Sequence, residues 1–183
     1  MPFLLNLILF QLCWIASVAG AGQGFWWAGP LAVLAFVVVV MKFSHRARAD
    51  LKLLGVACVA GLLIDSAYVQ LGLMRFASPV PSAELAPIWI IGMWASFALT
   101  LNHSLSFLKG RPLWSFVFGL VGGPFAYYVA ARNFGATELT ASPVMVYGAL
   151  AVAWAIMTPA LLALAVRWAP APGSPTPAAQ AAL

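Results

Sequence analysis

The sequence predicts an all-α fold, a polytopic membrane bundle of six transmembrane helices with both termini in the cytoplasm. The chain of 183 residues is 64% hydrophobic and only 7% charged, whereas soluble globular domains carry about a quarter charged residues. Its mean hydropathy is +0.99. Six apolar runs are long enough to cross a hydrocarbon core about 30 Å thick as helices. Basic residues gather in alternate loops, which is the pattern that orients such a bundle.

Six stretches of the sequence meet the length requirement for a membrane-spanning helix. They are Phe3–Gly20, about Phe25–Phe43, Leu51–Phe76, about Leu85–Phe107, Leu113–Asn133 and Pro143–Trp168. A glycine-rich segment over residues 20–24 separates the first two, which predicts a short turn between antiparallel helices. A β-barrel is disfavoured because its strands would alternate polar and apolar residues, and runs such as residues 31–41 do not alternate.

The two ends of the chain differ in character from the bundle. The first run is followed by a small-residue segment, Ala19-Gly20-Ala21, that resembles a signal-peptide cleavage site, but it lacks a basic start and contains Asn6 and Gln11. We therefore expect the first helix to be retained. Residues 1–168 are predicted to form the transmembrane domain. Residues 169–183 are rich in proline and alanine and uncharged, which predicts a disordered cytoplasmic tail.

The distribution of basic residues predicts the orientation. With six spans, seven basic residues fall on the side of the termini: Lys42, Arg46, Arg48, Lys52, Lys109, Arg111 and Arg167. Only Arg75 and Arg132 fall on the other side. Because basic loops stay in the cytoplasm, both termini are predicted to be cytoplasmic, in the inner membrane of a bacterium.

Composition also excludes several classes of function. The net charge of +5 does not indicate nucleic-acid binding, because the basic residues lie between apolar runs rather than on a polar surface. Cys13 and Cys58 form neither a disulfide framework nor a zinc motif, and His45 and His103 are too few for a recognised metal site. We expect no metal and no cofactor. The expected partners are membrane lipid and, as a further possibility, other membrane proteins.

Asp65 is the clearest candidate for a functional residue, because an acid deep in a membrane-spanning helix is costly and is often functional. It lies past the middle of the third run, about 21 Å from Leu51 along a helix. Gly61 and Tyr68 share its face, and the small Gly61 allows a neighbouring helix to approach. The alternative is a purely structural carboxyl that fastens helices together.

The fourth run carries a polar stripe if it is one helix. Ser96, Thr100 and His103 then share a face with Trp89, and Trp94 lies deeper, where it is placed to line a pocket. His103 lies near the cytoplasmic boundary, so its depth differs from that of Asp65 and a direct pair between them is not expected. A structural imidazole bonded to one neighbouring helix is the alternative for His103.

The first and fifth runs add further polar and small residues. By depth, Asn6 and Gln11 of the first run approach Thr100 and His103, while Trp14 and Ser17 approach Asp65 and Trp94; for the two amides, simple bridging between helices is the alternative. The fifth run contains Gly119 and Gly123 at the spacing of a packing motif, Pro124, which is expected to kink the helix, and then Tyr127.

Several short motifs resemble an uncharacterised family of bacterial inner-membrane proteins, catalogued as a domain of unknown function. These motifs are Asn6, Phe10-Gln11 and Trp14 in the first run, the lone Asp65 in the third, and Trp94, Thr100-Leu101 and Ser104-Leu105 in the fourth. The resemblance covers nearly the whole chain before the tail. Genes of that family often lie near genes for proteins similar to cyclopropane-fatty-acid synthases and amine oxidases. The resemblance therefore implies a role in membrane-lipid modification, and it assigns no catalytic residue.

Three functions remain open, and we favour the first. It is an accessory protein or enzyme of membrane-lipid or fatty-acid modification, with a pocket between the third, fourth and first helices. The second is a small permease in which Asp65 couples proton movement to solute passage. The third is a structural membrane partner without pocket chemistry. The candidate pocket residues are Asp65, Tyr68, Trp94, Ser96, Thr100, His103, Asn6, Gln11, Trp14 and Tyr127; the catalytic residues are unknown.

Overall fold

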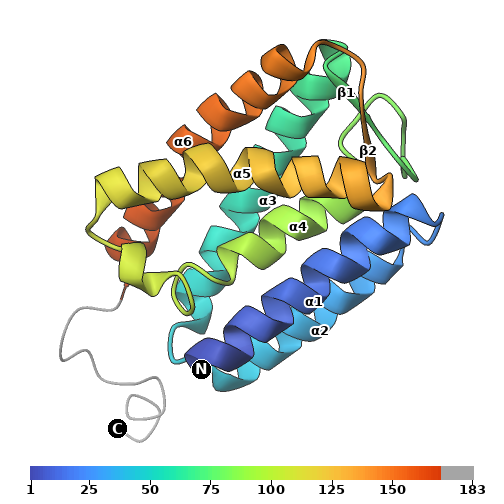
Figure 1. Ribbon diagram of the computed structural model, residues 1–183. Helices are drawn as coiled ribbons and strands as arrows, with labels where there is room; N and C mark the ends of the chain where they lie inside the picture. Colours follow the sequence, from blue (N-terminus) through green and yellow to red (C-terminus); the bar gives the residue numbers. More distant parts are fainter. Residues whose placement is uncertain (170–183) are drawn as a thin grey trace, which may run out of the picture.

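The computed structural model describes residues 1–169 and is predominantly helical (Figure 1). Its α-helices are α1 (Phe3–Gly22), α2 (Ala28–Phe43), α3 (Ala47–Gln70), α4 (Ile88–Ala98), α5 (Pro112–Phe134) and α6 (Pro143–Arg167). A 3₁₀ helix, η1 (Ser106–Leu108), and two short strands, β1 (Met74–Phe76) and β2 (Thr137–Leu139), complete the described chain. Apart from Ala169, the predicted disordered tail lies outside the described residues.

The helices lie side by side and successive helices run in opposite directions (Figure 1). α1 packs on α2, α3 on α4, and α5 on α6, while α4 also contacts both α1 and α2. The start of α1 and the end of α6 lie at the same end of the bundle, and β1 and β2 lie at the opposite end. We call the end that contains the start of α1 and the end of α6 the basic end, because Lys42, Lys109 and Arg167 lie there.

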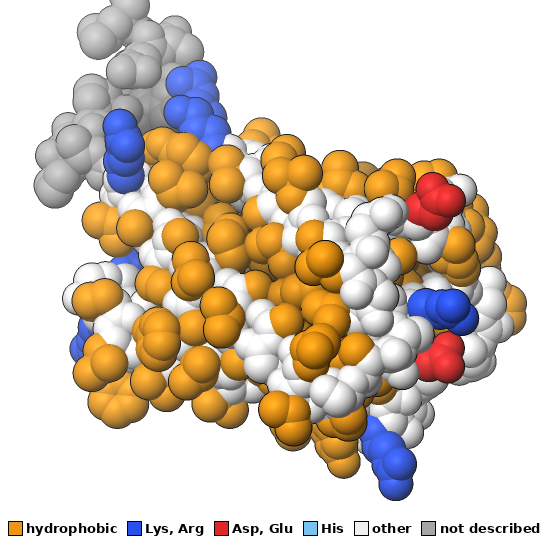
Figure 2. Space-filling model, turned by 90° about the horizontal axis from the view of Figure 1, so that it is seen from above, with side chains coloured by type: hydrophobic (Ala, Val, Ile, Leu, Met, Phe, Trp, Pro, Cys, Tyr) orange, Lys and Arg blue, Asp and Glu red, His pale blue; other side chains and the backbone are white. Residues whose placement is uncertain are grey.

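Four helices are long and apolar enough to cross a membrane: α1, α3, α5 and α6. The other two are shorter, with 16 residues in α2 and 11 in α4, or about 24 Å and about 16 Å along their axes. Figure 2 shows charged side chains at two opposite ends of the molecule and hydrophobic side chains over the surface between them. This surface suits a hydrocarbon surrounding better than water.

The predicted length of the fourth helix, Leu85–Phe107, is wrong. α4 ends at Ala98, and residues 99–105 form a series of turns that is nevertheless largely buried. Polar side chains donate hydrogen bonds to carbonyl groups that a continuing helix would use. Thr100 Oγ1 donates to the Phe97 oxygen at 2.6 Å, and Asn6 Nδ2 donates to the Leu99 oxygen at 3.0 Å. Such competition from side chains is a recognised cause of helix termination.

The third predicted helix, Leu51–Phe76, also ends early. α3 stops at Gln70, and Gly72 adopts the left-handed conformation (φ +64°) that commonly closes a helix. Residues Met74–Phe76 then form β1, which pairs antiparallel with β2, with Arg75 opposite Glu138. This two-stranded sheet corrects the prediction of a purely helical chain.

Small residues allow the helices to approach closely at two places. A Cβ atom on Gly61 of α3 would overlap the indole ring of Trp94 in α4, and Cβ atoms on Gly119 and Gly123 of α5 would overlap Trp154 of α6. The predicted packing roles of these three glycines are confirmed. α5 and α6 each continue as one helix through an internal proline, Pro124 and Pro159.

Candidate functional site

Asp65 is completely buried in the middle of the bundle. Trp94 Nε1 of α4 donates to its Oδ2 at 2.7 Å, and the Tyr127 hydroxyl of α5 donates to its Oδ1 at 2.5 Å. Each carboxylate oxygen thus has one uncharged donor from a different helix. Because buried polar groups are costly unless they are hydrogen-bonded, this pairing holds α3, α4 and α5 in a fixed relation.

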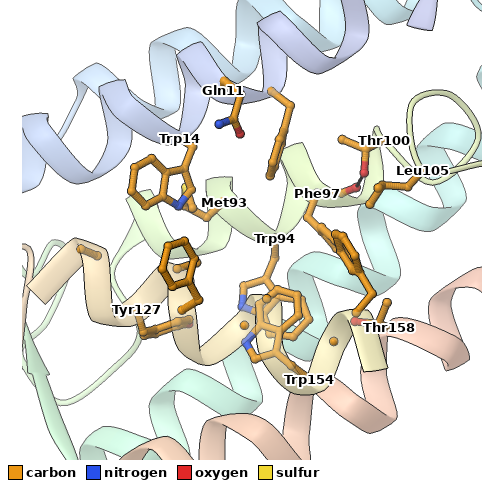
Figure 3. Close-up of a pocket in the computed structure, with 18 of the residues that line it drawn as sticks. Gln11, Trp14, Met93, Trp94, Phe97, Thr100, Leu105, Tyr127, Trp154 and Thr158 are labelled. Carbon is orange, nitrogen blue, oxygen red and sulfur yellow. Dashed lines mark hydrogen bonds between the residues drawn. The ribbon is translucent and has the colours of Figure 1, made fainter. Parts of the chain in front are cut away.

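The two side chains that bond to Asp65 form part of the wall of a large cavity (Figure 3). The cavity has a volume of about 660 Å³ and lies between α1, α4, α5 and α6. Its wall is rich in aromatic side chains, namely Phe10, Trp14, Trp94, Phe97, Tyr127 and Trp154. This volume falls within the range of roughly 300–1,000 Å³ that is usual for small-molecule sites.

The aromatic side chains of the wall are ordered against one another. The rings of Trp94 and Trp154 stack with centroids 4.5 Å apart, and Phe97 meets Trp154 edge-on at 5.2 Å. Trp94 also lies against Gly61, as described above, and is bonded to Asp65. Asp65 therefore acts behind the wall, where it fixes the orientation of a side chain that faces the cavity.

The cavity is elongated along α1. Its lining residues on this helix are Phe3, Leu7, Phe10, Gln11, Trp14 and Val18, which largely follow the three- and four-residue spacing of one helix face. Fifteen residues separate the first and the last, or about 22 Å of helix. The cavity thus runs along the long axis of the bundle, from the basic end toward the opposite end.

A few polar side chains interrupt the apolar wall. Within residues 1–169, four buried polar atoms have no hydrogen-bond partner, and three of them belong to residues that line the cavity: Thr137 Oγ1, Trp154 Nε1 and Thr158 Oγ1. Buried polar groups are usually bonded. The wall therefore keeps unused hydrogen-bonding capacity, at Trp154 and Thr158 of α6 and at Thr137 of β2.

A second polar cluster lies at the basic end, around the buried Asp50 in the first turn of α3. Asn102 Nδ2 donates to Asp50 Oδ1 at 2.7 Å, Ser44 Oγ donates to Oδ2 at 2.6 Å, and His103 Nε2 lies 3.1 Å from the same oxygen. Lys109 Nζ donates to Asn102 Oδ1. The partner of His103 is thus Asp50, and Asp65 is bonded elsewhere.

Sequence reasoning did not identify Asp50. The signal that was available is its setting, since it is the only acidic residue among the seven basic residues assigned to the cytoplasmic side. Because a carboxylate among basic residues usually lies on the surface, this setting draws attention to Asp50 but does not show that its side chain is buried.

The environment of Lys109 alters its titration. Burial and the nearby charge of Arg46 lower the pKa of Lys109 to about 8, while Asp50 acts in the opposite direction. Both dominant causes disfavour the charged ammonium. Lys109 is therefore held beside another cation at the basic end.

Asn6 of α1 joins this end of the bundle to the irregular segment. It is completely buried, and its Oδ1 accepts hydrogen bonds from the backbone nitrogen and the hydroxyl of Ser104, at 3.2 and 2.6 Å. Because Asn6 also bonds to Leu99, it holds both ends of the turns that replace the predicted helix.

The structure separates the ten predicted pocket residues into four groups. Five of them line the cavity: Gln11, Trp14, Trp94, Thr100 and Tyr127. Asp65 and Tyr68 lie behind its wall, and Asn6 and His103 belong to the polar contacts at the basic end. Ser96 turns back to its own helix and donates to the Met93 oxygen at 2.8 Å.

Two details of the predicted arrangement are wrong. The stripe of Ser96, Thr100 and His103 does not form one helix face, because the helix ends at Ala98. Ser17 does not approach Asp65; it packs against Gly29 of α2, where there is no room for a side chain. Apolar runs reveal helices but do not reveal where side-chain bonding ends them.

No group of three His, Cys, Asp or Glu side chains within residues 1–169 is placed to hold a metal ion.

Comparison with known proteins gives one match. A family model described as "Protein of unknown function (DUF2878)" matches residues 3–160. No curated protein and no solved structure matches the chain.

Proposed function

The chain belongs to the DUF2878 family, and we propose that it is an integral membrane protein that holds a membrane-lipid chain in the cavity between α1, α4, α5 and α6. The observation that carries this proposal is the cavity itself, which is elongated, mostly aromatic and aliphatic, and lined by three helices that are long and apolar enough to cross a membrane, α1, α5 and α6, together with the shorter apolar α4. A lipid chain in such a cavity keeps apolar surroundings and gains van der Waals contacts with the wall.

The same proposal includes the topology. Six passes of the chain through the inner membrane of a bacterium would place both termini in the cytoplasm, together with the basic end. In support, the start of α1 and the end of α6 lie at one end of the bundle (Figure 1), and the shorter α4 is continued toward that end by the buried segment 99–105. Irregular backbone at membrane depth is tolerated where protein covers it.

We further propose that the protein serves membrane-lipid or fatty-acid modification, as an accessory protein or as an enzyme. The chemistry of the cavity agrees with the lipid-related role that the sequence resemblance implies. A proton-coupled permease is less well supported, because both oxygens of Asp65 are bonded to uncharged donors behind the cavity wall. A purely structural partner would have no use for a cavity of about 660 Å³.

The direct test is to fill the cavity and to measure bound lipid. Gly122 lines the cavity, and a Cβ atom there would have its nearest neighbour 3.9 Å away, so Gly122→Leu places its side chain in open space within the cavity. Gly148→Leu is the matched control, because Gly148 of α6 has nothing within 4 Å and is absent from the residues lining the cavity. Native mass spectrometry of the purified proteins measures lipid occupancy.

We expect lipid on the wild-type protein and on Gly148→Leu, and at least a tenfold lower occupancy on Gly122→Leu. Equal occupancy in the three proteins would show that the cavity is not the lipid site. The role in modification has its own test, which is the lipid profile of a deletion strain complemented with each variant. A profile that the deletion leaves unchanged would remove this role.

A further inference from the structure

We propose that the cavity binds its lipid in one orientation, with an anionic head group at the basic end beside Lys109 and Arg111 and the end of the chain beside Val18 and Trp89. The inference deepens the proposed function and rests on it. The ligand class is a single-chain amphiphile with an acidic head group, whose anion is the carboxylate of a fatty acid or the phosphate of a lysophospholipid.

The cavity is open at one end and closed at the other. At the basic end its lining residues are exposed, with 52% of Phe3 and 53% of Phe107 accessible. At the far end the lining residues Val18 and Trp89 are each 1% exposed. A chain that lies along the cavity with its tail against Val18 and Trp89 therefore leaves its head group at the open end.

Near its open end, the cavity is also open on one side, toward the hydrocarbon that would surround the bundle. Leu7 of α1 and Phe118 of α5 line the cavity and are both exposed. The entrance therefore lies between α1 and α5, where the exposed lining side chains are apolar. A ligand delivered by the membrane can reach this entrance without leaving the lipid phase.

The charge at the open end is not balanced by the protein. Seven of the nine basic residues belong to this end, and Asp50 is the only one of the four acidic residues there. Asp50 is buried and already has three partners, Ser44, Asn102 and His103. At the opposite end Arg75 faces Glu138 across the sheet, so that end is nearly neutral.

Two of these basic residues lie close in the sequence to side chains that line the open end of the cavity. Lys109 lies two residues after Phe107, and its Nζ is held by Asn102. Arg111 is exposed and precedes α5, whose residues from Phe118 onward line the cavity. Basic side chains at the cytoplasmic membrane surface attract anionic lipid head groups, and Lys109 and Arg111 are therefore the two cations that we expect the head group of a bound chain to meet.

The test compares ligands that share one chain and differ in the head group. Dibrominated 18-carbon chains with a carboxylate, a phosphate, a neutral hydroxyl or a quaternary ammonium are titrated into the full-length protein in neutral detergent. Bromine quenches the fluorescence of Trp94 and Trp154 when the chain occupies the cavity. The Gly122→Leu variant, in which the cavity is filled, measures the quenching by ligand that is dissolved in the detergent micelle and not bound in the cavity.

The variants are Lys109→Gln and Arg111→Gln, with Arg132→Gln as the matched control. Arg132 is exposed in the last turn of α5, so it lies at the other end of the helix that Arg111 precedes. Arg111→Gln keeps the test decisive if Lys109→Gln disturbs Asn102, because Arg111 has no hydrogen-bonded side-chain partner within residues 1–169.

We expect both anionic ligands to bind the wild-type protein at least tenfold more tightly than the neutral one, and the cationic ligand to bind most weakly. Each variant should reduce this preference several-fold, Arg132→Gln should leave it unchanged, and salt should weaken it. Either order of carboxylate and phosphate supports the inference and identifies the source of the anion.

Equal binding of the charged and neutral ligands would overturn the inference and would show that these cations serve only to orient the chain in the membrane. A preference that survives both substitutions would also overturn it. If no ligand quenches the wild-type protein more than Gly122→Leu, the proposed lipid cavity itself fails, which is a different result from the loss of head-group preference.

Discussion

At the scale of single residues, the two buried carboxylates have different surroundings. Asp65 bonds to the donors of two aromatic side chains, which are themselves parts of the cavity wall. Asp50 bonds to smaller polar groups that fix the turns at the basic end. An acid in the membrane requires such partners, so each carboxylate reveals which neighbouring segment the fold must hold in place.

Removal of the Asp65 carboxylate should destabilise the bundle through its partners. Asp65→Ala leaves the Trp94 and Tyr127 donors buried and unpaired, each at a cost of about 1–3 kcal/mol. Tyr127→Phe in the wild-type chain should cost about 1 kcal/mol, since it removes one bond of the kind measured in membrane proteins. Unfolding in mixed micelles, followed by circular dichroism, measures both.

The double variant provides the control for this coupling. In the Asp65→Ala background, Tyr127→Phe should cost nothing or restore stability, because it removes a donor that no longer has an acceptor. The same loss from Tyr127→Phe in both backgrounds would show that the hydrogen bond to Asp65 does not contribute to stability.

Lys109 should react as an unusually acidic lysine. Its pKa of about 8 means that half of its amines are neutral and nucleophilic near pH 8, whereas an ordinary lysine reaches this point near pH 10.4. The rate of Lys109 acylation, followed by peptide mass spectrometry between pH 6.5 and 11, should therefore reach half its maximum near pH 8.

Substitution of the neighbouring charges should move this midpoint in opposite directions. Arg46→Gln removes a repelling cation and should shift it to higher pH, while Asp50→Asn removes an attracting anion and should shift it lower. A midpoint near that of an ordinary lysine in the wild-type protein would contradict the burial of this side chain.

At the residue scale, chemistry was easier to predict from the sequence than geometry was. The costly position of Asp65 within an apolar run identified it, and the depth of Trp94 within its run predicted that it lines a pocket. Asp50 was missed because it lies near four basic residues at the start of a helix, where a charged side chain usually remains exposed to water at little cost in free energy. The Asp50 side chain points inward because it contacts Asn102 and His103. These two residues reach it only because α4 ends early and the chain turns.

At the scale of elements, the packing of α5 on α6 depends on glycines that differ in their surroundings. All three glycines Gly119, Gly122 and Gly123 line the cavity, but only Gly119 and Gly123 also lie against Trp154, whereas Gly122 has open space beside it. The spacing of Gly119 and Gly123 predicted this contact. The end of α4 could not be predicted in the same way, because Asn6, which takes up the Leu99 carbonyl, lies 93 residues away in the sequence.

Alanine substitutions should separate these glycines. Gly119→Ala forces a methyl group into the backbone of Trp154 and should lower stability by about 1–3 kcal/mol. Gly122→Ala meets no close neighbour and should be neutral or raise stability by up to about 1 kcal/mol, because alanine favours the helix. Thermal unfolding in detergent compares the two, and equal losses would mean that the α5–α6 contact is looser than described.

At the scale of the whole molecule, the number, order and direction of the helices follow from hydropathy, while their lengths do not. Residues 71–76 and 99–105 fall within the predicted third and fourth helices, yet one segment enters the small sheet and the other forms turns. Both departures depend on contacts between distant segments, namely β1 with β2 and Asn6 with Ser104. Local periodicity does not report such contacts.

The proposed topology makes the last prediction. A reporter that is active only outside the cytoplasm should be silent when fused after Arg167, and active when inserted at Glu84 in the loop before α4, because the seven basic residues retain their end of the bundle in the cytoplasm. A reporter that fluoresces only in the cytoplasm should give the opposite pattern at the two positions. Activity of the first reporter after Arg167 would place the basic end outside and would reverse the direction in which an acidic lipid enters the cavity.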